Sequence, residues 1–293
     1  MVHSSREATR EERAQGAFVK DMVERQLGLG RPLFPAHRID RPASGVLVFG
    51  RTAEACRRVR AAMAHPSAIK EYLVLVRGSP PNEFTCDKPL KDDRDALKPA
   101  LSHFRRLLEI PQHRCALLSV RISTGRRHQI RRHLNHLAFQ VIGDSVHGKG
   151  RINAHFRQNH HLPPSRLFLH AARLLLPLHA HAPEAEPLPL LTPDGRFIDA
   201  PEEESSHPLN TPERGFPLLH ALEGEFSYLH TLPVVSTLES SVGRAEGLLE
   251  IVAPLPDDLI QVLLSLGLDT DTIISLNQFN LAPETHLDRV RGV

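Results

Sequence analysis

CALLSVRISTGRRHQIRRHLNHLAFQVIGD, residues 115–144, contains a strand pattern and a helix pattern joined by a short turn. Apolar and β-branched residues over 115–122 predict a strand, and Ser-Thr-Gly over 123–125 predicts the turn. Beyond the turn we expect a helix with Thr124 as its N-cap, because apolar residues recur there at helical spacing. These apolar residues are Ile130, Leu134 and Leu137. The stretch therefore predicts a strand followed by a helix that packs through one apolar face.

The flanking sequence predicts further strands and helices. Helices are expected over 17–27 and 52–65, one or two strands over 166–180, and single strands over 45–52 and 70–78. Another strand and an amphipathic helix are expected over 246–268. The order shows no regular βαβ repeat and no glycine-rich phosphate fingerprint, which argues against a doubly wound fold. We therefore predict an α+β fold.

Charge is divided unevenly along the chain, although the net charge is only +2. Residues 191–293 contain 5 Arg, no Lys and 17 acidic residues, whereas residues 1–190 contain 31 basic and 17 acidic residues. A basic body suggests a polyanionic partner, because each Lys or Arg near a phosphate releases a counterion. A well-solvated surface would give the same count, so charge alone favours nucleic acid only weakly.

Length and composition exclude several other classes. The 293 residues, 41% of them hydrophobic, can bury one large core with an appendage. No apolar run approaches the roughly 20 residues that span a bilayer, so no membrane protein is expected. Three widely spaced cysteines without a CxxC motif indicate a reducing compartment. We expect a cytoplasmic protein, with an organelle as the alternative, because the opening 16 residues contain Arg and Ser but also several Glu.

HRIDRPASG, residues 37–45, places a single acid, Asp40, between Arg38 and Arg41. An acid between arginines is usually a surface ion pair, worth about 0–1 kcal/mol. Here the prolines fix the loop, Gly45 permits close approach of another backbone, and a predicted strand anchors the segment. Functional groups are often held in this way.

STGRRHQIRRH, residues 123–133, gathers arginines at the start of the predicted helix: Arg126, Arg127, Arg131 and Arg132. A helix N-terminus favours anions and disfavours cations. This local electrostatic cost suggests a function, such as binding a phosphate backbone or a carboxylate. The alternative is a solvated basic face.

Tyr72 and the histidines have ordinary explanations when each is taken alone. Tyr72 shares one face of its predicted strand with Val74 and Val76, as a core tyrosine would. The 19 histidines include groups within 128–136 and 155–161, but they form neither an HExxH motif nor a Cys/His finger, and no acid lies among them. We therefore expect no metal site.

Taken together, these segments resemble the RluA-type pseudouridine synthases. HRIDRPASGVLVF is similar to that family's HRLDxxTSG motif. KEYLVLVRG, STGRRHQIRRHLNHLAFQVIGDSVHG and RLFLHAARL resemble its later motifs, in the same order. The arginine pair after the second motif and GDSVHGKGRINAHF are most similar to the C-type members, which act on tRNA. The resemblance covers about residues 31–182, and EIVAPLPDDLIQVLLSLG resembles the family's terminal strand and helix.

The resemblance implies a pseudouridine synthase catalytic fold with a mixed, mainly antiparallel sheet and flanking helices. It divides the chain into a catalytic domain (1–182), an acidic Pro/Glu/Ser-rich insertion (183–245), the terminal strand and helix (246–268) and a tail (269–293). The family begins with a strand and a KPxG segment, and this chain starts near the expected end of that segment, so we expect the strand to be missing. Ala43 replaces the usual Thr, which we expect to be tolerated.

The resemblance also assigns roles to individual residues. The family isomerises uridine in RNA to pseudouridine and needs neither a cofactor nor a metal. Asp40 would be the catalytic carboxylate, attacking C1′ of the ribose or removing a proton from C2′, with Arg126 keeping it ionised. Tyr72 would stack on the flipped uracil and help to deprotonate C5, while Arg38 enters the space that the uridine leaves. Phosphate contacts are expected from Arg41, Arg127, Arg131 and Arg132, and a site-shaping role from His37, Ser44, Gly45, Thr124, Gly125, His128 and Gln129.

The sequence therefore predicts a monomeric pseudouridine synthase that acts on structured RNA, with tRNA favoured over rRNA. One alternative is an RNA-binding derivative that is no longer catalytic, against which the retention of Asp40, Tyr72 and Arg126 counts. Another is a metal-dependent hydrolase that uses the histidine groups.

Overall fold

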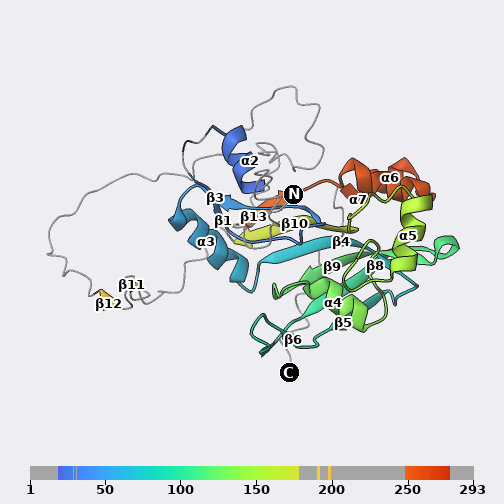
Figure 1. The fold of residues 1–293 in the computed structure, drawn as a ribbon, viewed down its shortest axis with the longest axis horizontal. Helices are drawn as coiled ribbons and strands as arrows, with labels where there is room; N and C mark the ends of the chain where they lie inside the picture. The colour runs from blue at the N-terminus through green and yellow to red at the C-terminus, as the bar shows by residue number, and fades with distance from the viewer. Residues whose placement is uncertain are drawn as a thin grey trace.

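The computed structural model describes residues 19–28, 30, 32–177, 190–191, 197–198 and 248–277 (Figure 1). The predicted acidic insertion lies outside the described residues, apart from two short paired strands, β11 (Leu190–Leu191) and β12 (Phe197–Ile198). Among the described residues, no helix is both long enough and apolar enough to cross a membrane.

A seven-stranded mixed sheet forms the centre of the molecule, as predicted. Its strand order is β13-β10-β4-β9-β8-β5, and every neighbouring pair along this path is antiparallel. The seventh strand, β2, pairs with β10 in the parallel direction. The strands are β2 (Ser44–Gly45), β4 (Ile69–Arg77), β5 (Glu83–Cys86), β8 (Ser102–Ile110), β9 (Cys115–Ile122), β10 (Leu169–Pro177) and β13 (Leu248–Val252).

The remaining elements flank this sheet. Two further antiparallel pairs join β1 (Phe34–Pro35) to β3 (Phe49–Gly50) and β6 (Leu90–Lys91) to β7 (Leu97–Lys98). The helices are α2 (Val19–Gln26), α3 (Ala53–Ala64), α4 (Gln129–His136), α5 (Gly150–Asn159), α6 (Asp257–Ser265) and α7 (Thr270–Asn277), with a 3₁₀ turn over Pro111–His113.

Most predicted elements are present, and several others were missed. The strands predicted over 115–122 and 70–78 correspond to β9 and β4, and the terminal strand and helix correspond to β13 and α6. The strand predicted over 45–52 is wrong in extent, because only β2 and β3 form there. Sequence patterns did not indicate β8, whose SHFRRLLEI sequence mixes charged and apolar residues, nor α5 and α7.

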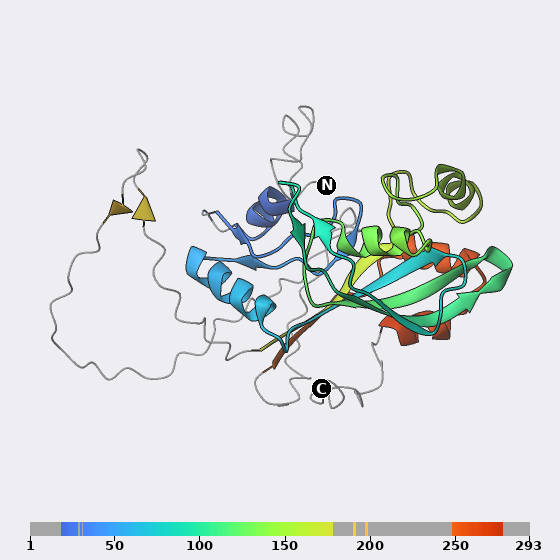
Figure 2. The same cartoon turned by 90° about the horizontal axis from the view of Figure 1, so that it is seen from below.

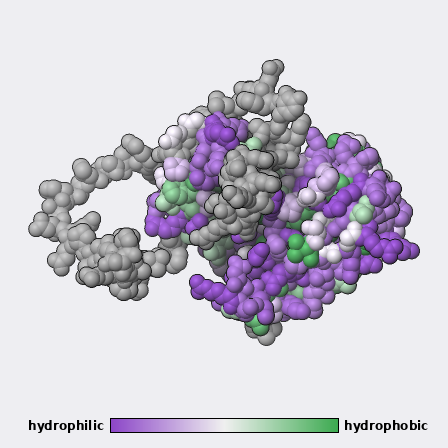
Figure 3. Space-filling model, in the orientation of Figure 1, coloured by the Kyte–Doolittle hydropathy of each residue, from purple (hydrophilic) through white to green (hydrophobic). Residues whose placement is uncertain are grey.

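Two apolar clusters fill the opposite faces of the sheet. Along β4, Leu73 and Leu75 belong to the cluster that includes α6, whereas Val74 and Val76 belong to the cluster that includes α4. This alternation follows the two-residue period of a strand. Figure 2 shows the green helix α4 lying along the strands of the sheet. The described surface in Figure 3 is mostly hydrophilic, with apolar residues in small separate patches.

The start of α4 differs from the prediction. The residue before the helix is His128, with a φ of 52°, and it makes no side-chain cap. Thr124 is not the N-cap: its Oγ1 donates to Gln129 Oε1 at 2.7 Å and accepts from the Leu101 amide at 3.2 Å. Gln129 Nε2 in turn donates to the Leu101 carbonyl at 2.9 Å. Thr124 and Gln129 therefore join the helix start to the segment before β8.

We predict that Gly45→Ala strongly destabilises the fold. Gly45 has a φ of +113°, and a Cβ there would lie 2.1 Å from the backbone oxygen of Ala171. Strain and overlap together should lower the free energy of unfolding by more than about 2 kcal/mol, measured by urea denaturation. Gly125→Ala is the matched control, because its Cβ would meet no atom within 4 Å. Equal unfolding midpoints for the two variants would contradict the prediction.

Candidate active site

Asp40 lies in the loop between β1 and β2, which contacts from both sides hold in place. The Ala43 amide donates to the Asp40 carbonyl at 2.9 Å, and the Val46 amide donates to the Ala171 carbonyl at 2.8 Å. His37 Nε2 accepts a hydrogen bond from the Val48 amide at 3.0 Å. The Asp40 side chain is 15% exposed, so it can be reached from solvent while most of it is desolvated.

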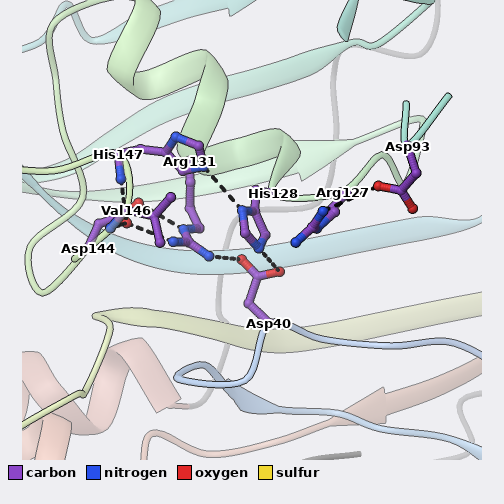
Figure 4. Close-up of polar contacts among 8 residues, drawn as sticks. All are labelled: Asp40, Asp93, Arg127, His128, Arg131, Asp144, Val146 and His147. Carbon is purple, nitrogen blue, oxygen red and sulfur yellow. Dashed lines mark hydrogen bonds and ion pairs between the residues drawn. The ribbon is translucent and has the colours of Figure 1, made fainter. Parts of the chain in front are cut away.

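The cation that binds Asp40 is Arg131 of α4 (Figure 4). Arg131 Nη1 donates to Asp40 Oδ2 at 2.9 Å. The prediction that Arg126 makes this contact is wrong, because Arg126 is exposed and its Nε donates to the Pro99 carbonyl at 3.0 Å. Arg126 precedes the helix, whereas Arg131 lies one and a half turns further along the chain and points toward the Asp40 loop.

Asp144 holds the other side of the same guanidinium. Arg131 Nε donates to Asp144 Oδ2 at 2.8 Å, and Nη2 donates to Oδ1 at 2.7 Å. Arg131 is 3% exposed, so the prediction that it contacts phosphate is also wrong. Burial alone would raise the pKa of Asp144, but the Arg131 hydrogen bonds and the amides of Val146 and His147 lower it on balance. The same two carboxylates raise the pKa of Arg131, against the effect of burial.

Asp144 was not predicted, although the sequence contains a signal for it. It is the only acid between Glu109 and Glu184, in a stretch that contains many arginines and histidines. A lone acid in a cationic segment is a candidate partner for one of those cations, but the sequence does not indicate which one.

His128 lies beside Asp40, and His147 lies beside His128. His128 Nε2 lies 3.9 Å from Asp40 Oδ1, and His128 Nδ1 lies 3.1 Å from His147 Nε2. Burial lowers the pKa of both histidines, and the nearby positive charge of Arg131 lowers it further, while the charge of Asp40 acts in the opposite direction. The two rings are therefore neutral at neutral pH.

Tyr72 lies on β4, on the strand face that carries Val74 and Val76, as predicted. Burial and the nearby negative charge of Asp40 raise the pKa of Tyr72 to about 12. The phenol therefore keeps its proton at neutral pH. Tyr72 and Asp40 come from distant parts of the chain, and the fold brings them into electrostatic contact.

The C-terminal segment braces the Asp40 loop through Arg166. Arg166 Nε donates to Asp258 Oδ2 of α6 at 2.7 Å, and its Nη1 donates to the Pro42 carbonyl at 2.7 Å. Its Nη2 donates to Ser44 Oγ at 2.6 Å. The loop that carries Asp40 is therefore fixed by a residue that also binds the helix formed after residue 256.

A second chain of hydrogen bonds runs from Ser44 to the residue directly after β13. His170 Nε2 donates to the Ala253 carbonyl at 2.9 Å, so its Nδ1 accepts from Ser44 Oγ at 2.8 Å. Burial lowers the pKa of His170 to about 4, which keeps the ring neutral in this arrangement. The predicted site-shaping role of Ser44 thus corresponds to a contact with the C-terminal segment, which sequence patterns did not indicate.

The other predicted arginines lie around this centre. Arg38 and Arg41 are exposed on the Asp40 loop. Arg127 is exposed and lies 3.3 Å from Asp93, in the turn between β6 and β7. Arg132 Nη1 donates to the Lys91 carbonyl of β6 at 2.9 Å. Arg127 and Arg132 therefore connect the α4 region to the β6–β7 hairpin.

Metal-binding side chains do not gather within the described part of the chain. No group of three or more His, Cys, Asp or Glu residues there could hold a metal ion. The three cysteines, Cys56, Cys86 and Cys115, are buried and unpaired. The chemistry available at Asp40 in the described residues is therefore that of a partnered carboxylate beside a tyrosine and two neutral histidines.

Comparison with known proteins gives one consistent result. Residues 3–136 match the family model described as RNA pseudouridylate synthase. The chain is 37% identical over 168 residues to tRNA pseudouridine synthase C of Salmonella typhimurium (strain LT2), covering 50% of this chain and 64% of that protein. It is 34% identical over 177 residues to tRNA pseudouridine synthase C of Vibrio vulnificus (strain CMCP6), covering 54% of this chain and 71% of that protein.

The fold has a counterpart among solved structures. The human protein RNA Pseudouridylate Synthase Domain Containing 4 aligns with a TM-score of 0.50 and 17% sequence identity, over 87% of this chain and 84% of that chain. At this identity the likeness concerns the fold alone. The chain spans somewhat less than two thirds of the length of the Salmonella relative.

We predict that Asp144→Asn lowers the free energy of unfolding at neutral pH. The free energy of unfolding of the variant should also change less than that of the wild type as pH falls. Breaking a buried ion pair should lower the free energy of unfolding by about 3 kcal/mol at neutral pH. Because folding lowers the pKa of Asp144, its contribution is complete above about pH 4 and is lost as pH falls below that value.

Denaturant unfolding of wild type and variant at pH 7 and at several lower pH values measures this effect. The two stabilities should converge as Asp144 is protonated in the wild type. Asp93→Asn, at the exposed partner of Arg127, should behave like the wild type throughout. A difference between Asp144→Asn and wild type that stayed constant from pH 7 to pH 3 would contradict the assignment.

Proposed function

Because this chain belongs to the RNA pseudouridylate synthase family, we propose that it isomerises a uridine in RNA to pseudouridine with Asp40 as the catalytic carboxylate. The observation that supports this most directly is the contact between Asp40 and the buried Arg131, since it holds one carboxylate in place at a partly exposed position. Tyr72 lies close enough for the charge of Asp40 to raise its pKa.

The reaction needs one ionised carboxylate and no electron transfer. The C1′–N1 bond breaks, a C1′–C5 bond forms, C5 loses its proton and N1 gains one. Arg131 occupies Oδ2 of Asp40, which leaves Oδ1 free to attack C1′ or to remove the proton from C2′. Hydrolysis of a glycosidic bond generally uses two carboxylates across the bond, whereas the second acid here, Asp144, is turned toward Arg131.

Tyr72 fits a stacking role better than the role of a base. With a pKa of about 12, it is almost entirely protonated at neutral pH. Its aromatic ring can still stack on a base that has been flipped out of the RNA, and stacking is worth roughly 1–3 kcal/mol per base. Such contacts help to offset the cost of extruding the uridine.

The surface around the site carries groups that suit an RNA backbone. Arg38, Arg41, Arg126 and Arg127 are exposed near the site, on the Asp40 loop and before α4. At and after the start of α5, exposed cations continue with Lys149, Arg151 and Arg157, and no acid occurs from 145 to 177. Cations of this kind bind phosphates and fix the position of an RNA without reading its sequence.

Within RNA we propose tRNA as the substrate, because the two bacterial relatives described above are both named tRNA pseudouridine synthase C. The alternatives are rRNA and an RNA-binding protein without activity. The exposed Arg38 beside Asp40 would fill the space that the uridine leaves.

We predict that the chain releases tritium from RNA labelled at uridine C5, and that Asp40→Asn abolishes the release. The amide cannot act as a nucleophile or a base, so release should fall by at least about 10³-fold while tRNA binding is retained. Labelled tRNA and rRNA transcripts are tested in parallel. Equal release by Asp40→Asn would reject Asp40 as the catalytic group, and RNA binding without release by the wild type would favour the inactive binder.

We further predict that the two candidate arginine partners of Asp40 differ in their effect on the rate of tritium release. Arg131→Lys should reduce tritium release by about 10²-fold or more, because lysine cannot donate to both Asp40 and Asp144 in the geometry of a guanidinium. Arg126→Lys should keep the rate at saturating RNA, because Arg126 contacts the Pro99 carbonyl and not Asp40. Circular dichroism confirms folding of both variants. Loss of the saturating rate in Arg126→Lys alone would reinstate Arg126 as the partner of Asp40.

A further inference from the structure

His147 and His128 form a connected pair that ends at the proposed catalytic carboxylate. The rings are nearly perpendicular, with an interplanar angle of 77° and a distance of 5.3 Å between centroids. His128 Nδ1 faces His147 Nε2 at 3.1 Å, and His128 Nε2 faces Asp40 Oδ1 at 3.9 Å (Figure 4). His128 thus lies between His147 and the oxygen of Asp40 that Arg131 does not contact.

The position of the protons in this pair follows from Asp40. A neutral imidazole carries one N–H, so one ring must donate and the other accept in the contact between them. If His128 donated through Nδ1, its Nε2 lone pair would face the carboxylate, which is unfavourable. If His147 donates through Nε2, His128 accepts at Nδ1 and carries its proton on Nε2, directed at Asp40. The second arrangement is favoured because an N–H then faces the negative charge.

The backbone of His147 is fixed by the same group that fixes Arg131. The amides of Val146 and His147 both donate to Asp144 Oδ1 at 2.9 Å. Asp144 therefore sets the positions of both the Arg131 guanidinium and the backbone of the His147 loop. The ring of His147 thus comes from a segment whose placement is tied to the centre.

We propose that His147 is a positioning residue, which donates to His128 Nδ1 and so holds the His128 N–H toward the reactive oxygen of Asp40. This inference rests on the proposed function, because its effect on rate is an effect on pseudouridine formation. In the resting site the N–H orients the carboxylate. When the ribose approaches, the same N–H lies beside the oxygen that reacts.

The charged and titratable groups that face His128 determine how its titration responds. They are Asp40 from the loop after β1, Arg131 from α4, Arg127 from the preceding turn and His147 from the loop after α4. Burial lowers the pKa of His128, Asp40 raises it, and the two arginines and His147 lower it. Removing the His147 ring deletes one lowering effect, so the pKa of His128 should rise. Activity that requires neutral His128 should then be lost at a higher pH than in the wild type.

The test compares His147→Leu with His147→Gln. Gln places an amide N–H near the position of Nε2 and can still donate to His128, whereas Leu cannot. His155→Leu, at an exposed histidine of α5, is the control for loss of a histidine elsewhere. Each variant is measured for tritium release from labelled tRNA across pH. The His128 tautomer is measured by ¹⁵N NMR of the imidazoles, with the signal assigned through His128→Gln.

The inference predicts a specific pattern. His147→Leu should release tritium about tenfold more slowly at neutral pH, the factor for one lost hydrogen bond in a charged network, with its acid limb shifted to higher pH. His147→Gln and His155→Leu should stay near the wild type. By NMR, His128 should be the Nε2–H tautomer in the wild type and a mixture in His147→Leu.

Other results would overturn the inference. These are an unchanged rate and pH profile in His147→Leu, a slower rate without a change in tautomer, or an Nδ1–H tautomer of His128 in the wild type. If the wild type releases no tritium from any RNA, the proposed function fails, and the NMR comparison alone decides. A tautomer that is lost in His147→Leu then supports the role of His147, and one that is unchanged rejects it.

Discussion

The buried guanidinium of Arg131 is the interaction on which the site depends. It makes three hydrogen bonds to two carboxylates that lie more than a hundred residues apart in sequence, Asp40 and Asp144. A charge this far from water is tolerated only when its partners are nearly ideal in geometry, and removal of one partner leaves the others costly to bury. The same contacts therefore stabilise the fold and prepare the carboxylate. The packing of α4 against the sheet and the orientation of Asp40 therefore depend on the same guanidinium.

A second constraint acts on the Asp40 loop from the other side. Arg166 links the loop to α6, and Ser44 links it through His170 to the Ala253 carbonyl. Both contacts reach residues that follow the acidic stretch in sequence: Ala253, directly after β13, and Asp258 of α6. The loop is thus clamped between elements that precede and follow that stretch. Its conformation depends on completion of the sheet, even though the loop sequence already restricts its own backbone through proline.

These two constraints leave Asp40 as a carboxylate that is held on one side and partly exposed. Asp144 is fully engaged with Arg131 and backbone amides, Tyr72 keeps its proton, and the nearby histidines are neutral at neutral pH. Asp40 is left with one oxygen bound and one free. The isomerisation proposed above consumes no water and transfers no electrons, and it requires one carboxylate with an accessible oxygen.

The sequence by itself determined the α+β class, the strands β4 and β9, the helix after the turn, and Asp40 as the acid of interest. These follow from local periodicity, from proline and glycine in one loop, and from the order of the motifs along the sequence. The tertiary structure decided which arginine meets Asp40, because several arginines lie within seven residues and only the packing of α4 on the sheet selects Arg131. It also decided the contacts of Asp144, Arg166 and His147. Their partners are distant in the chain, and a hydrogen bond between distant residues produces no repeating pattern of residue types in the sequence.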